Sequence, residues 1–278
     1  MPENKRIDNS MDNAISKYTL TDRMSDLVRD DCRLLQVMSR FGISLGFGDK
    51  SVQEVCTLHG VDAITFLAVA NFMQEEDELV HTDVQSLSIP TMMDYLKRAH
   101  SYYLDFCLPT IREKLINAID NPANHQVALL IQKFFDEYVS EVREHMEFEN
   151  RHEFQYVCSL MQGDVEKAER ITHEACPMKA LVHKDEHGTP ISVYHAGEHS
   201  NILLFTRRHA LQHKQIDRKL SELKNIIIKY YPASQNNHLL NAVLFDIFTC
   251  EEDLALHCRI EDCLFVPAVR LLEKKCGL

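Results

Sequence analysis

Hydrophobic residues recur along most of the chain at steps of three and four, which is the period of an α-helix with one buried face. This pattern predicts four long helices near 90–119, 124–159, 190–230 and 237–274, separated by polar stretches. Shorter helical pieces precede them. We therefore predict an all-α protein, with a four-helix bundle at residues 86–278. A small helical N-terminal domain at residues 1–85 comes before it and opens with a polar tail, residues 1–17.

Two of the four long helices carry a His-x-x-x-Glu pair inside the buried stripe. In the last helix the stripe reads Val243, Ile247, Cys250, Leu254, His257, Glu261, Leu264 and Ala268. In the second helix it reads Ile131, Phe135, Tyr138, Val142, His145 and Glu149. Residues four apart lie one turn apart on the same helix face. Both pairs are therefore predicted to point into the core.

The other two helices add histidines to the same interior. The first has the stripe Met93, Leu96, His100, Tyr103 and Cys107, and the third places His195 and His199 on one face. Burying so many ionisable groups without partners would cost several kcal/mol each. A metal cluster removes this cost, because imidazoles and carboxylates become ligands. Four histidines and two bridging carboxylates suit two metal ions, and the lack of thiolates favours iron over structural zinc, with manganese and zinc as alternatives.

Each feature taken singly has a simpler interpretation. A lone core histidine is usually hydrogen-bonded to a neighbour. A His/Glu pair at i and i+4 is often a surface pair worth about 0.2–0.5 kcal/mol. The metal hypothesis depends on the conjunction of two such pairs with further histidines, all on inward stripes.

Composition narrows the class of protein. The formal net charge of −12 argues against binding to nucleic acid or to an anionic membrane surface. There is no apolar run of about 18 residues and no apolar signal segment at the N-terminus, so we expect a cytoplasmic protein without a membrane span. Nine cysteines without a C-x-x-C pair indicate reduced, mostly buried thiols.

Four segments carry a resemblance to a known family. They are "RAH" (98–100), "HMEFE" (145–149), "EH" (198–199) and "HCRIEDCLFVPA" (257–268). The chain resembles, over roughly residues 30–272, the hemerythrin-like di-iron domain of the repair-of-iron-centres proteins. The resemblance implies two iron ions with terminal ligands His100, His145, His199 and His257 and bridging ligands Glu149 and Glu261. It places Glu141 and Glu198 beside the site or along a substrate channel, and His195 is the alternative ligand from the third helix.

The same resemblance implies a function in repairing iron–sulfur clusters damaged by nitric oxide or oxidants. Iron donation and nitric oxide reduction are the two activities it suggests, with iron–sulfur proteins as clients. The alternative is a hemerythrin-like module that binds or senses O₂ or NO without turnover, and the third reading is a helical scaffold without metal. The oligomeric state stays open, a dimer included.

The N-terminal block departs from the family pattern. The family usually has adjacent cysteines where this chain has Gly46 and Phe47, and Cys56 lies in an amphipathic helix that favours packing. We therefore expect residues 1–85 to serve docking or partner recognition, and the bundle to hold its metal without them.

Overall fold

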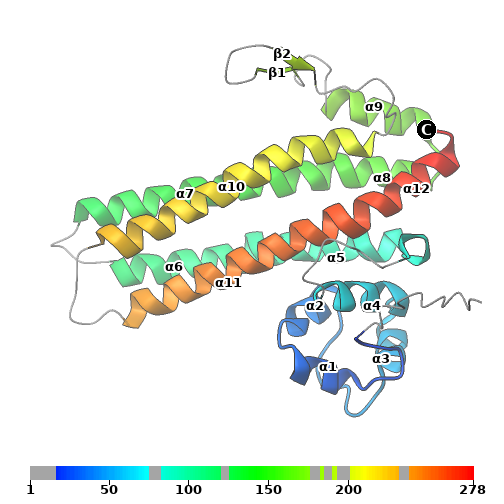
Figure 1. Cartoon of the computed structure of the whole chain (residues 1–278), viewed down its shortest axis with the longest axis horizontal. Coiled ribbons are helices and arrows are strands. Elements are labelled where there is room, and N and C mark those ends of the chain that lie inside the picture. Colours follow the sequence, from blue (N-terminus) through cyan, green and yellow to red (C-terminus); the bar gives the residue numbers. More distant parts are fainter. Residues whose placement is uncertain are drawn as a thin grey trace, which may run out of the picture.

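The computed structural model describes residues 17–74, 83–119, 125–175, 182–184, 190–192, 201–231 and 238–278. Nearly all of these residues are helical, as the sequence predicts. The long helices of the described residues form four rods. Figure 1 shows these rods side by side, with a cluster of short helices beside them. The described residues therefore form a helical bundle with a helical block beside it.

Three of the four rods are interrupted helices. The first consists of α5 (Ile89–Ser101), η2 (Tyr102–Cys107) and α6 (Leu108–Ile119). The second consists of α7 (His125–Phe148), η4 (Glu149–Glu153) and α8 (Phe154–Met161). The fourth consists of α11 (His238–Ile260), η6 (Glu261–Phe265) and α12 (Val266–Cys276), and the third is the single helix α10 (Ile202–Tyr230). The segments η2, η4 and η6 are π-helical. The predicted spans agree with the rods except in the third.

The third rod begins about twelve residues later than predicted. Pro190–Ser192 is strand β2, which pairs antiparallel with β1 (Val182–Lys184), with Val182 opposite Ser192. Ile191 is β-branched, a residue type that favours strands, and the antiparallel pairing with β1 gives this segment an extended backbone. The backbone N–H of Ile202, the first residue of α10, donates to Oε1 of Glu273 in α12 at 2.8 Å.

A further helix occupies the stretch that the sequence pattern gives as a polar connection. α9 (Val165–Ala175) follows α8 after a turn at Gly163, whose φ of +74° is the left-handed region that favours glycine. Its buried positions are the small residues Ala168, Thr172 and Ala175. Small residues give a weak hydrophobic signal, which explains why the pattern missed this helix.

The N-terminal block contains α1 (Met24–Asp30), α2 (Leu34–Arg40), α3 (Val52–His59) and α4 (Ala63–Phe72), and the short η1 (Val84–Ser86) leads into the bundle. α3 opens with a complete capping box between Ser51 and Glu54 and ends at the left-handed Gly60. Cys56 is fully buried, and this burial raises the pKa of its thiol to about 12. The predicted packing role of Cys56 is confirmed.

The hydrophobic core runs from the N-terminal block into the rods. One cluster joins Met24, Leu34 and Phe66 of the block to Leu96 and Leu264 of the first and fourth rods. A second cluster fills the space between the rods farther along, with members such as Ile111, Phe135, Leu223 and Ile247. The division into two domains near residue 85 stays a prediction, but the core crosses that point of the chain.

Candidate metal centre

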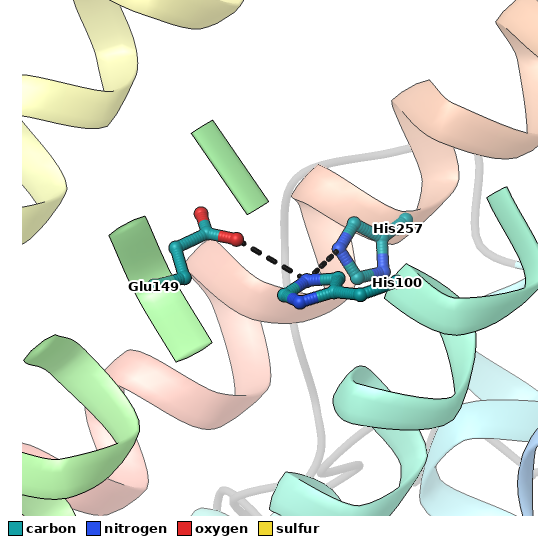
Figure 2. Close-up of side chains that lie close together, drawn as sticks. All are labelled: His100, Glu149 and His257. Carbon is teal, nitrogen blue, oxygen red and sulfur yellow. Dashed lines mark hydrogen bonds and ion pairs between the residues drawn. The ribbon is translucent and has the colours of Figure 1, made fainter. Parts of the chain in front are cut away.

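Three buried side chains from three different rods meet at one point. His100 comes from α5, Glu149 from the start of η4 and His257 from α11, and their candidate ligand atoms all lie within 4.8 Å of one another. Nε2 of His100 lies 3.2 Å from Nε2 of His257 and 3.2 Å from Oε2 of Glu149. Figure 2 shows both imidazoles and the carboxylate converging on this point. The group could hold a metal ion.

His145 extends the group along the second rod. Its Nε2 lies 3.0 Å from Oε1 of Glu149, one helical turn farther on. Glu149 therefore faces a different histidine with each of its two oxygens, His145 with Oε1 and His100 with Oε2. Glu149 therefore lies between two histidines of different rods, with one oxygen towards each.

The outer ring nitrogens fix the tautomers of two histidines. Nδ1 of His100 lies 3.1 Å from Oδ1 of Asn150, and Nδ1 of His145 lies 3.3 Å from Oε1 of Gln212 in α10. An amide oxygen only accepts, so each Nδ1 carries the proton and donates it. Each Nε2 then presents a lone pair to Glu149. Metal-bound histidines are usually oriented by such a donated N–H bond.

These lone pairs fit a cation at the centre. Burial lowers the pKa of His100 to about 4, so its imidazole is neutral near pH 7. Burial raises the pKa of Glu149 well above 4.5, which favours a protonated carboxyl. Such a carboxyl can donate its single proton to only one of the two Nε2 atoms that face it. Oε1 of Glu261, buried near the same point, has no hydrogen-bond partner in the described part of the chain. Metal ions would satisfy the nitrogen and oxygen atoms together, so the donor set fits iron or a similar ion.

Each π-helical segment lies next to a residue of this group. η4 begins at Glu149 and η6 begins at Glu261, while η2 begins two residues after His100. A π-helical turn adds a residue to a helix and is frequent at functional sites. In the three rods that contain such a segment, the extra residue shifts which side chains point inward at the level of the group.

The predicted ligands divide into three sets. His100, Glu149 and His257 are brought together, and His145 contacts Glu149. Glu261 is buried one turn after His257, and the negative charge of Glu149 is among the causes that raise its pKa, after burial. The remaining predicted residues, His195, Glu198 and His199, lie outside the described residues.

Glu141 lies one turn before His145 and is partly buried between α7 and α10. It forms an ion pair with Lys219 of α10. With Glu144, Gln212 and Ile216 it lines a cavity of about 220 Å³. Because Gln212 also holds His145, this small cavity lies beside the group.

Sequence reasoning missed three residues of the centre. Glu153 is fully buried, and burial, followed by the charges of Glu261 and Glu149, raises its pKa well above 4.5. The step of four that leads from His145 to Glu149 leads on to Glu153, so a longer stripe would have included it. Asn150 and Gln212 gave no such signal, because neither amide marks a metal site by itself.

Aromatic rings and a buried cation surround the histidines. Phe154 stacks on His100 with ring centroids 5.6 Å apart, and Tyr103 lies edge-on to His257 at 5.8 Å. The Tyr103 hydroxyl accepts a hydrogen bond of 3.0 Å from Arg40 of α2, which is 1% exposed and forms an ion pair with Asp253 of α11. Arg40 of the N-terminal block therefore contacts the ring that packs against His257.

The fold and this group define a helical protein whose core contains a buried His/Glu group that could hold a metal ion. No protein-family model matches the chain, and no curated protein matches its sequence.

Proposed function

We propose that the chain is a hemerythrin-like, non-haem di-iron protein that acts in the repair of iron–sulfur clusters under nitrosative or oxidative stress. The observation that supports the metal site is the position of Glu149 between His100 and His145, with His257 closing the group. The family resemblance of the sequence supports the assignment to repair.

The donor chemistry favours iron within this proposal. The ligands are imidazoles and carboxylates, and none of the residues grouped at the centre is a cysteine. Imidazole and carboxylate donors of this kind suit iron or manganese, whereas structural zinc is usually bound by thiolates. Bound iron would supply electron exchange and binding of a diatomic ligand, or would itself be the donated cargo.

The protein's own residues have separate tasks in this scheme. Asn150 and Gln212 hold the rings of His100 and His145 in orientation through their Nδ1–H groups. Phe154 and Tyr103 keep water from the imidazoles. Within the described helices none is both long and apolar enough for a membrane span. We propose action in the cytoplasm on iron–sulfur client proteins, with O₂ or NO as the small ligand.

Metal analysis of protein purified without oxygen tests the first part of the proposal. We expect close to two iron ions per chain and the visible absorption of a bridged di-iron centre. His173→Ala is a matched control, because His173 is exposed on α9, and it should retain the metal. One zinc ion per chain, or no metal, contradicts the di-iron assignment.

A second measurement separates repair from gas binding. The iron-loaded protein is mixed with an iron–sulfur enzyme that nitric oxide has inactivated, and the recovery of enzyme activity is followed. Recovery that requires the iron-loaded chain supports repair. Reversible binding of O₂ or NO without recovery supports the alternative, a binding or sensing module.

A further inference from the structure

Two cysteines meet between the first and fourth rods, away from the candidate metal centre. Cys107 is the last residue of η2 and Cys250 lies in α11, and their Sγ atoms are 3.7 Å apart. Each cysteine is seven residues from a histidine of the centre, His100 and His257 respectively. Seven helical residues span about 10 Å, so the thiol pair lies two turns along the same two rods.

A cavity of about 430 Å³ opens beside the pair. Both cysteines line it, together with Tyr102 and Phe106 of η2 and Arg33 of the N-terminal block. Cys107 is partly exposed whereas Cys250 is buried. A molecule that enters the cavity therefore reaches Cys107 before Cys250.

The more accessible thiol, Cys107, is also the more acidic of the two. A hydrogen bond from the S–H of Cys250 to the Cys107 thiolate lowers the pKa of Cys107, and a bond from the Tyr102 hydroxyl adds to the effect. The same contact with Cys107 raises the pKa of Cys250. The accessible thiol is thus the one that more readily forms the nucleophilic thiolate.

We propose that Cys107 and Cys250 form a thiol–disulfide exchange site that small disulfides oxidise through this cavity. The Cys107 thiolate attacks one sulfur of the disulfide, a protein–small-molecule S–S bond forms, and the first small thiolate leaves and takes up the proton that Cys107 lost. Cys250 then gives up its proton and attacks Sγ of Cys107, which releases the second small thiol. The protein loses two protons and two electrons, and the small disulfide gains them to become two small thiols.

The geometry requires only a local movement for the second step. A disulfide has an S–S distance of about 2.05 Å, so the sulfurs must approach by about 1.7 Å from their 3.7 Å separation. Rotation about the Cα–Cβ bonds moves a sulfur atom through such a distance. The alternative reading is a pair of packed thiols that do not react with added disulfide.

Exchange with oxidised glutathione tests the proposal on the full chain. The reduced protein is incubated with oxidised glutathione, free thiols are blocked, and peptides are mapped by mass spectrometry without reductant. We expect two of the nine thiols to be lost as a Cys107–Cys250 cross-link. Buried Cys56, whose pKa is raised to about 12, should react at least about tenfold more slowly than Cys107.

Single substitutions establish the order of attack. Cys250→Ser should trap one glutathione on Cys107, whereas Cys107→Ser should leave Cys250 unmodified over the same time. The matched control is Cys32→Ser, because Cys32 is exposed and lines the same cavity, and this variant should form the cross-link like the unaltered protein.

Two results would overturn the proposal. One is a Cys32→Ser protein in which Cys107 and Cys250 stay reduced at glutathione ratios that modify other thiols. The other is a Cys107→Ser variant in which Cys250 reacts with glutathione as fast as Cys107 does in the unaltered chain. If a serine variant fails to fold, a time course on the unaltered chain decides the matter, because the mixed disulfide on Cys107 must precede the cross-link.

Discussion

Nε2 of His100 and Nε2 of His257 lie 3.2 Å apart, although the two residues are 157 positions apart in the chain. Asn150 accepts the Nδ1 proton of His100, so the Nε2 of that ring has only a lone pair to present. This nitrogen therefore faces either a proton on Nε2 of His257 or a cation between the two rings. The predictions on the metal centre follow from this contact.

Loss of a bridging carboxylate should remove more metal than loss of one histidine. We expect Glu149→Ala and Glu261→Ala to fall well below one iron per chain, and His257→Ala to retain more, because a bridge contacts both ions. Inductively coupled plasma analysis of protein purified without oxygen measures this. Glu144→Ala is the control, since Glu144 is exposed next to His145. A glutamate variant with full iron and an unchanged spectrum would show that this glutamate is not a ligand.

The amides that orient the histidines should matter nearly as much as ligands. Asn150→Leu removes the acceptor of the His100 Nδ1 proton, and such losses typically weaken metal affinity by about 10–100-fold. Asn150→Asp keeps an acceptor oxygen and should restore most of the affinity. Competition with a metal chelator measures both variants. Equal affinity in the leucine and aspartate variants would contradict a role for this bond.

The metal-free protein should lose stability as the pH rises above 7. Burial raises the folded-state pKa values of Glu149, Glu153 and Glu261 well above 4.5. The unfolded chain therefore releases protons that the folded chain keeps, and stability falls as the pH rises towards the folded pKa values. His100, with a folded pKa of about 4, acts in the opposite direction, but only below about pH 6.5.

Thermal unfolding between pH 7 and pH 9 tests this sign, because His100 contributes no slope there. We expect a decline that flattens in Glu153→Gln, since a neutral amide has no proton to lose. Bound metal should reverse the trend, because it requires deprotonated ligands. A melting temperature of the metal-free chain that rises over this range would contradict the raised pKa values.

The buried ion pair between Arg40 and Asp253 should contribute strongly to folding. Arg40→Met leaves Asp253 without its cation and should cost about 3 kcal/mol in the free energy of unfolding. The double variant Arg40→Met/Asp253→Leu should recover much of this loss. Arg29→Met is the control, because Arg29 is paired with Asp26 on the surface, where such pairs contribute about 1 kcal/mol or less. Additive losses in a double-mutant cycle from urea titrations would show that the pair is uncoupled.

Periodicity found much of the centre because ligands on regular helices keep to one face. The stripes that include Leu96 and Val142 lead directly to His100 and His145, and both are buried as predicted. The pattern gave no account of the π-helical segments, whose extra residue changes the helix face after Glu149. Glu153 continues the step of four but lies beyond the end of the predicted stripe, and Asn150 was missed because an amide does not by itself mark a metal site.

The hydrophobic periodicity could not predict contacts between segments that are distant in the chain. Arg40 ends a short helix and looks like a surface residue in the sequence, yet its side chain is buried against α11. The predicted start of the third long helix, near residue 190, was wrong. His195 and His199 have the spacing of one helix face, whereas Pro190–Ser192 form a strand. Gln212 lies in the same helix and was missed because an amide does not by itself mark a metal site.

The separation of these partners in the chain sets an order for events during synthesis. Arg40 and Asp253 are 213 residues apart, so the N-terminal helices leave the ribosome long before their buried charge can meet its partner. A nascent chain that ends before residue 257 contains His100, His145 and Glu149 but neither His257 nor Glu261. Capture of a metal ion by the proposed centre would therefore come at the final stage of folding, after nearly the whole polypeptide has emerged.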